Sequence, residues 1–400
     1  MGEGVEQPPP PAYEELVGLP VTAVAQPPAY NPDAPPVYES GPAAKGLLRE
    51  IILPEGKPSA PPYVRQVSDE QRRQYLATLD LPPGIANEIL QSCKVFPLRI
   101  WVIDNSGSMG TLDGHKLVRG QAGNEGLQAC SRWGELGDAI LWHAMLAANL
   151  GAPTEFRLLN APIAAGGGRY QVLQCGTREP ADEIAQVQEM LRTDPFGRTP
   201  LCEQLSQVVG RVKEEEARLR TQGLRALVIV ASDGEATDGS VSEAMRPFRD
   251  LPVWTVVRLC TDEDSVVEYW NSVDEDLELD LDVLDDLCGE AREVAQGNPW
   301  LTYGAPLHFL REWGTARKVF DTLDEAPLNE AQMIDMVKLI AGDDVKLPSA
   351  RDWPAFEAAI KQVNAKLGPV WDPIRSRKRP WFSVSKLKKR YSGRAGCIIS

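Results

Sequence analysis

The stretch LRIWVIDNSGSM, residues 98–109, carries the strongest indication of the fold. Its first seven residues form a short apolar run with β-branched and aromatic side chains, which is typical of a strand buried on both faces of a sheet. The run ends at Asp104, and two hydroxyls follow at Ser106 and Ser108. A carboxylate and two hydroxyls at this spacing, on a turn leaving a strand, can converge on one hard cation.

The chain on either side of this stretch alternates strand and helix patterns, which favours an α/β fold. After Trp133, apolar residues recur on one helical face as far as Leu150. Strands are predicted over residues 155–160, 169–175, 224–232 and 252–260, and helices over 181–191 and after Pro200. The Gly166–Gly168 triplet favours a hairpin turn between the first two of these strands over a phosphate-binding loop. We therefore expect a mostly parallel, Rossmann-like sheet with helices on both faces, and ligands at the carboxyl ends of its strands.

Two further oxygen donors stand at matching places along the chain. Thr199 precedes Pro200 and a predicted helix, and Asp233 directly follows the apolar strand LVIVAS. Taken alone, Thr199 can equally be a helix cap, and Asp233-Gly234 can be a turn. Their order and their positions beside predicted strand and helix ends favour membership of the same site as Asp104.

With these residues in place, the chain over roughly residues 95–290 resembles the von Willebrand factor A family. That family carries a D-x-S-x-S…T…D metal-ion-dependent adhesion site on a Rossmann-like sheet. The resemblance implies a divalent cation, usually Mg²⁺, surrounded by residues at the matching positions: Asp104, Ser106, Ser108, Thr199 and Asp233. One departure is a glycine-rich stretch between Ser108 and Trp133, long enough to cover or reshape the rim of the site.

Such a site suits adhesion better than catalysis. Three hydroxyls and two carboxylates, one of which in the family often acts through water, leave the cation incompletely neutralised. An Asp or Glu of a protein partner can then complete its shell. We expect a non-enzymatic protein, because the chain lacks an HExxH or a GxxxxGK[ST] motif and has only three histidines. The alternatives are a metal-dependent phosphoester hydrolase that uses the Asp104 site, and a copine-like membrane-binding protein. Nothing in the chain resembles paired C2 domains.

Composition and charge exclude several other classes. The chain has 400 residues, of which 43% are hydrophobic and 25% charged, and its longest apolar runs fall far short of a membrane span. Seven cysteines without CxxC spacing argue against a disulfide scaffold or a zinc site and favour a reducing compartment. A net charge of −15 disfavours nucleic-acid binding. The acidic run from Asp274 to Asp286 lacks calcium-loop spacing, and with the alternating leucines of residues 277–284 it predicts an outer strand followed by a helix start.

The N-terminal segment predicts partner recruitment. It holds 11 of the 33 prolines within residues 1–45 and has almost no apolar periodicity, so we expect it to be disordered with polyproline II character. Three PPxY motifs resemble ligands of WW domains, including those of HECT-type ubiquitin ligases. The alternative is a disordered tail without a partner. The predicted contact residues are Pro10, Pro11, Tyr13, Pro27, Pro28, Tyr30, Pro35, Pro36 and Tyr38.

The other end of the chain predicts membrane attachment. The final residues CIIS match a CaaX box with Cys397 as the prenylated residue, although a terminal cysteine can occur by chance. One lipid needs a second signal, and from Pro373 onward there are nine basic residues and no acidic one. The residues expected to face an anionic membrane are Arg375, Arg377, Lys378, Arg379, Lys386, Lys388, Lys389 and Arg390. Trp381 and Phe382 either insert into the interface or pack on the helical region.

Together these patterns divide the chain into five segments. We expect a disordered segment (1–64), a short helical segment with two helices broken at Pro82-Pro83 (65–94), the von Willebrand factor A-like domain (95–290), a helical C-terminal region (291–370) and a basic tail with the CaaX box (371–400). The predicted function is an adaptor that binds an acidic protein ligand through the cation and WW-domain proteins through the PPxY motifs. Its predicted location is the cytoplasmic face of a membrane, with a cytosolic pool.

Overall fold

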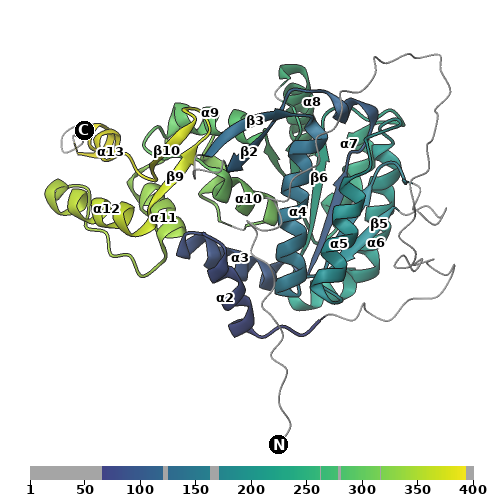
Figure 1. Cartoon of the computed structure of the whole chain (residues 1–400), viewed down its shortest axis with the longest axis horizontal. Coiled ribbons are helices and arrows are strands. Elements are labelled where there is room, and N and C mark those ends of the chain that lie inside the picture. The colour runs from purple at the N-terminus through teal and green to yellow at the C-terminus, as the bar shows by residue number, and fades with distance from the viewer. Residues whose placement is uncertain are drawn as a thin grey trace, which may run out of the picture.

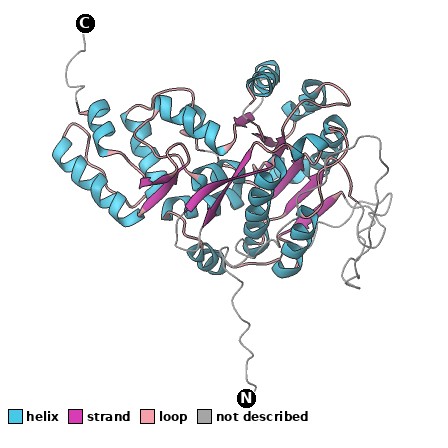
Figure 2. Cartoon of the chain, turned by 45° about the horizontal axis from the view of Figure 1, so that its top comes forward, coloured by secondary structure: helices cyan, strands magenta, loops and turns pink. Residues whose placement is uncertain are grey.

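The computed structural model describes residues 65–119, 125–162, 171–261, 263–277, 281–315 and 317–392. It shows an α/β architecture, with helices on both faces of a sheet and a smaller, mainly helical lobe beside it (Figures 1 and 2). The PPxY motifs, the Gly166–Gly168 triplet and Cys397 lie outside the described residues.

The central sheet confirms the prediction of a mostly parallel arrangement. Its six strands lie in the order β5-β4-β1-β6-β7-β8. Every neighbouring pair is parallel except β4 and β5, which pair antiparallel as the predicted hairpin requires. The strands are Leu98–Ile103 (β1), Thr154–Leu158 (β4), Val172–Cys175 (β5), Ala226–Ser232 (β6), Val253–Leu259 (β7) and Leu281–Leu284 (β8).

Strand β1 is buried along its whole length because each of its faces packs against helices. Trp101 and Ile103 enter a core shared with α4 (Arg132–Leu150), whereas Ile100 and Val102 enter the opposite core, shared with α6 (Leu201–Gln222). Continuous apolar sequence rather than alternation is the pattern expected for such a strand. The other helices of the sheet region are α5 (Pro180–Leu191), α7 (Val241–Met245), α8 (Asp264–Leu277) and α9 (Leu287–Gly297).

The acidic segment from Asp274 to Asp286 is divided differently from the prediction. The strand expected over residues 277–284 starts only at Leu281, because helix α8 continues to Leu277. Trp270, Val273 and Leu277 are buried in one core at helical spacing, and this packing outweighs the alternating pattern that follows. As expected, β8 is an outer strand of the sheet.

The glycine-rich stretch between Ser108 and Trp133 forms a structure that the sequence patterns do not predict. A single turn, η1 (Gly107–Gly110), is followed by an antiparallel ribbon of β2 (Gly114–Arg119) and β3 (Glu125–Cys130). The ribbon packs against α4. Its first residue lies so close to the start of that helix that a Cβ on Gly114 would be 2.7 Å from the Ser131 carbonyl oxygen.

The predicted helices outside the sheet region are confirmed. Two short helices, α2 (Asp69–Thr78) and α3 (Pro83–Val95), are separated at Pro82-Pro83, and α2 begins with a capping box at Ser68. The C-terminal lobe comprises α10 (Ala305–Trp313), α11 (Glu330–Ala341), α12 (Trp353–Leu367), β9 (Pro369–Asp372), β10 (Arg377–Pro380) and α13 (Val384–Tyr391). One hydrophobic cluster runs from Trp101 in the sheet through Trp313 to Leu387, so the lobe and the sheet share a core.

The basic stretch from Arg375 to Arg390 is folded. It forms β10 and α13, which belong to the C-terminal lobe at the end of the molecule away from the sheet (Figure 1). Trp381 and Phe382 are buried at 2% and 1% exposure, so they pack on the lobe and are not available to insert into a membrane. Asp372 accepts hydrogen bonds from Arg375 and Arg379 at 2.9 and 3.1 Å, which neutralises part of the basic charge. Among the described helices, none is both long and apolar enough to cross a bilayer.

Candidate metal centre

The candidate centre lies where two neighbouring parallel strands end. Ile103 at the end of β1 pairs with Ala231 in β6, and the Asp104 N–H donates to the Ala231 carbonyl at 2.9 Å. The loops that follow these strands therefore leave the same edge of the sheet. This placement brings Asp104 close to Ser232, the last residue of β6, although the two lie 128 positions apart in the sequence. Asp233 directly follows Ser232 and therefore also lies close to Asp104.

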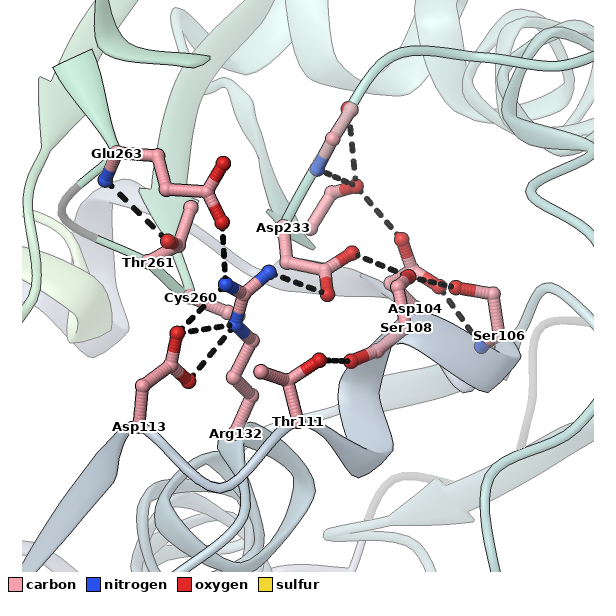
Figure 3. Close-up of polar contacts among 12 residues, drawn as sticks. Asp104, Ser106, Ser108, Thr111, Asp113, Arg132, Asp233, Cys260, Thr261 and Glu263 are labelled. Carbon is pink, nitrogen blue, oxygen red and sulfur yellow. Dashed lines mark hydrogen bonds and ion pairs between the residues drawn. The ribbon is translucent and has the colours of Figure 1, made fainter. Parts of the chain in front are cut away.

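Four of the five predicted ligands form one hydrogen-bonded group. The Ser106 N–H donates to Asp104 Oδ1 at 2.8 Å, and the Oγ atoms of Ser106 and Ser108 are 2.9 Å apart. The Ser108 hydroxyl in turn donates to Asp233 Oδ1 at 2.9 Å (Figure 3). Two carboxylates and two hydroxyls therefore face one another, and Ser108 is the member exposed to solvent. A donor set made only of oxygens fits a hard cation such as Mg²⁺.

The fifth predicted ligand, Thr199, lies on an adjoining loop. Its carbonyl accepts from the Thr237 N–H at 2.9 Å, and its own N–H donates to the Thr237 hydroxyl at 3.2 Å. The same loop is joined to the Asp104 loop, because the Gly107 N–H donates to the Gly197 carbonyl at 3.2 Å. In the part of the chain that the structure describes, no hydrogen bond joins the Thr199 hydroxyl to the other four residues.

Asp104 is a buried carboxylate that no cationic side chain among the described residues contacts. It is 0% exposed, and its two oxygens are held by the Ser106 N–H and, at 2.7 Å, by the Ser232 hydroxyl. Burial raises the pKa of Asp104, the hydrogen bonds from Ser106 and Ser232 oppose that shift, and the nearby charge of Asp233 adds to it. Ionised Asp104 is therefore stabilised by hydrogen bonds but, within the described residues, not by an opposite charge.

Arg132 is a part of the site that the sequence patterns do not identify. The residue is only 5% exposed. Its guanidinium binds three carboxylates from three separate segments: Asp113, Asp233 and Glu263 (Figure 3). The contact with Asp233 Oδ2 is 3.0 Å, so one oxygen of Asp233 faces the serines and the other faces the arginine. Hydrogen bonds from Arg132 also lower the pKa of Asp113 below its ordinary value.

One signal in the sequence points to Arg132. It is the first residue of α4, after the N-cap Ser131, and a cation in the first turn of a helix is disfavoured by the helix dipole. A basic residue at such a position indicates a compensating anion nearby. The identity of that anion depends on loops that only the tertiary structure brings together.

A second group of carboxylates lies at the junction of the sheet and the C-terminal lobe. Oxygens of Glu290, Glu293 and Asp324 approach within 4.8 Å of one another. The Arg311 guanidinium binds Glu290 and also contacts Asp324 at 3.0 Å, so the cation of this group is a side chain of the protein itself. In the Asp104 group, by contrast, Arg132 contacts only Asp233, and among the described residues no cationic side chain contacts Asp104.

The comparisons with known proteins are sparse. No protein-family model matches the chain, and no curated protein matches it either. Among solved structures, the chain is similar to the crystal structure of the conserved hypothetical protein BatB from Bacteroides thetaiotaomicron. The match has 13% identity and a TM-score of 0.32, and it covers 54% of this chain and 98% of that one. The case for the α/β fold therefore rests on the sheet order described above.

Proposed function

We propose that the chain is a non-enzymatic, membrane-associated adaptor whose residues 95–290 form a von Willebrand factor A-type domain. In this proposal Asp104, Ser106, Ser108, Thr199 and Asp233 hold a divalent cation, Mg²⁺. The bound cation supplies a positive site for the carboxylate of a protein ligand. The observation that carries the proposal is the buried carboxylate of Asp104, which no cationic side chain among the described residues contacts, beside two hydroxyls at the carboxyl ends of β1 and β6.

The surroundings of the site favour binding over catalysis. His143 and His308 are buried in the core beside Glu312, at 2.9 and 3.6 Å. His115 lies in the β2–β3 ribbon, where its backbone N–H donates to Glu135 at 2.8 Å. Three carboxylates around the site, Asp113, Asp233 and Glu263, are already engaged with Arg132. This leaves hydroxyls and carboxylates, which are suited to holding a cation.

Calorimetric titration of Mg²⁺ and Mn²⁺ into the full chain tests the metal site. Asp104→Ala should abolish binding without loss of fold, whereas Asp335→Ala, an exposed carboxylate on α11, should bind as the wild type does. Equal affinity in the Asp104→Ala variant would refute the site. Metal-dependent phosphoester hydrolysis that disappears in the same variant would replace the adaptor with a hydrolase.

The N-terminal part of the proposal is recruitment of WW-domain proteins, with HECT-type ubiquitin ligases as candidates. It rests on the three PPxY motifs, which present an aromatic anchor on a polyproline segment. Replacing Tyr13, Tyr30 and Tyr38 together by alanine should abolish binding to a tandem-WW protein, measured by calorimetry. Undiminished binding would show that this segment is not the docking site.

The C-terminal part of the proposal is a prenyl anchor at Cys397, assisted by the basic residues of β10 and α13. Lys388 and Lys389 are exposed on α13, and each basic residue near an anionic leaflet contributes about 1 kcal/mol. Cys397→Ser should shift the protein from the membrane fraction to the cytosolic one. If both forms fractionate identically, the lipid anchor is wrong.

A further inference from the structure

Two of the most exposed apolar side chains of the described residues lie beside the candidate metal centre. The exposed large hydrophobic residues are Leu112 at 79%, Phe196 at 40% and Ile374 at 40%. Single exposed apolar residues need no explanation, but two at one functional site do. We refer to Leu112 and Phe196 as the apolar rim.

The first rim residue is held in place by the loop that carries the serines. Leu112 follows Thr111, whose N–H and hydroxyl both donate to the Ser108 carbonyl, at 2.9 and 2.7 Å. It precedes Asp113, which is bound by Arg132. The exposure of Leu112 is therefore fixed by contacts on both sides of it in the sequence.

The second rim residue is fixed in a similar way on the adjoining loop. The Phe196 N–H donates to the Asn105 carbonyl at 2.7 Å, directly beside Asp104 in the sequence. The two loops touch, because a Cβ on Gly110 would lie 3.8 Å from Pro195 Cγ. The rim is thus a preformed surface next to the exposed Ser108, and presenting it costs no ordering of the backbone on binding.

From this geometry we infer that the ligand of the metal centre is a protein segment in which an Asp or Glu stands next to one or two large apolar side chains. The inference rests on the proposed function. The carboxylate completes the shell of the cation, and the neighbouring apolar side chains cover Leu112 and Phe196. Apolar contacts around a desolvated polar anchor are the usual arrangement of an interface hot spot.

Charge favours a protein segment over a membrane surface at this site. The loops of the rim and the centre carry exposed carboxylates at Asp113, Asp194, Glu235 and Asp238. An acidic surface repels the dense negative charge of an anionic leaflet much more strongly than a segment with a single carboxylate among apolar side chains. The basic surface suited to such a leaflet, on β10 and α13, belongs to the C-terminal lobe at the other end of the molecule (Figure 1).

Selection of random dodecapeptides displayed on phage tests the inference. The full chain is immobilised with Mg²⁺, and bound phage are released with EDTA. The wild type should select acidic residues next to large apolar ones. The double variant Leu112→Ser/Phe196→Ser should select acidic residues without that neighbour preference, and the best wild-type peptide should bind it about tenfold more weakly for each side chain removed. Ile374→Ser, which removes the third exposed apolar side chain, should behave as the wild type does.

The outcomes separate the rim from the metal site. If the double variant selects the same peptides with the same affinity as the wild type, the rim has no such role. If the wild type yields no peptide released by EDTA, the proposed function fails, and the inference fails with it. Unchanged Mn²⁺ affinity of the double variant shows that its site is intact. If Asp104→Ala selects the wild-type peptides, the proposed function itself fails. Weaker binding of the double variant to phosphatidylserine vesicles would assign the rim to a lipid surface and overturn the inference.

Discussion

The two carboxylates of the candidate centre are compensated differently. Asp233 has a buried ionic partner in Arg132, whereas Asp104 has only uncharged hydrogen-bond donors. A cation bound between them would therefore contact Asp233, whose charge is already neutralised by Arg132, and Asp104, whose charge is not. Because Arg132 offsets part of the negative charge of Asp233, the bound cation would keep more of its own positive charge. That charge would then attract the carboxylate of a ligand more strongly.

This difference predicts an unusual result for Arg132→Gln. Without metal, the variant should be destabilised by about 3 kcal/mol, because Asp233 loses its buried partner. With Mg²⁺ or Mn²⁺, the cation should replace the lost charge, so the metal should raise the melting temperature more in the variant than in the wild type. Thermal unfolding with and without metal measures both effects.

The matched control for this prediction is Arg246→Gln. Arg246 pairs with Glu243 at 2.8 Å on an exposed helix surface, where ion pairs contribute little. Its response to metal should equal that of the wild type. If Arg132→Gln binds no metal, Arg132 acts instead by positioning Asp233.

Among the structural elements, the packing of α3 on α11 depends on one glycine. A Cβ on Gly84 would clash with the Leu339 carbonyl oxygen and would lie 2.7 Å from the Gly342 nitrogen. Both atoms belong to the end of α11. The absence of a side chain at Gly84 therefore allows the two helices to approach closely.

Gly84→Ala should lower the free energy of unfolding by about 1–3 kcal/mol, because two backbones must move apart. The control is Gly210→Ala on α6, where nothing lies within 4 Å of the added Cβ. That change should stabilise the protein by up to about 1 kcal/mol through helix propensity. Urea unfolding of both variants measures the difference, and equal effects would contradict the close packing.

At the scale of the whole molecule, a buried polar network joins the sheet to the C-terminal lobe. Glu312 of α10 is fully buried and contacts His143 of α4, Arg258 of β7 and His308 of its own helix. Burial lowers the pKa of His308 to about 4, and it also lowers the pKa of His143. Both imidazoles are therefore neutral in the folded protein at neutral pH.

This network predicts that acid destabilises the fold before most carboxylates titrate. The unfolded chain takes up a proton at His308 near its ordinary pKa of 6.5, whereas the folded chain does so only near 4. The stabilisation is complete above pH 6.5 and is lost as the pH falls towards 4, by at most about 1.4 kcal/mol per pH unit for this imidazole. Urea unfolding between pH 7 and 5 should show the slope.

Two substitutions identify the group responsible. His308→Gln should decrease the slope, because it removes one of the titrating imidazoles. His115→Gln, which removes an exposed imidazole of the β2–β3 ribbon, should leave the slope unchanged. An unaltered slope in the His308→Gln variant would show that this group does not control the acid response.

Local sequence patterns are sufficient to predict the buried strands and the meeting of the two carboxylates. The apolar runs of β1, β6 and β7 predict buried parallel strands, because a strand covered on both faces has no polar side. The positions of Asp104 and Asp233 directly after such strands predict that they meet, because parallel strands end at the same edge of a sheet. Occupation of the site by a metal stays a prediction.

Contacts between segments distant in the sequence follow from the folded arrangement of the loops and could not be predicted. Arg132 reaches Asp233 across 101 residues, and no local pattern specifies that pairing. The same holds for Trp381, which is buried at 2% exposure although it lies between basic residues that have the composition of a charged tail. The physical reason is that a side chain's charge and burial depend on which loops fold against it, and loops carry little periodic information.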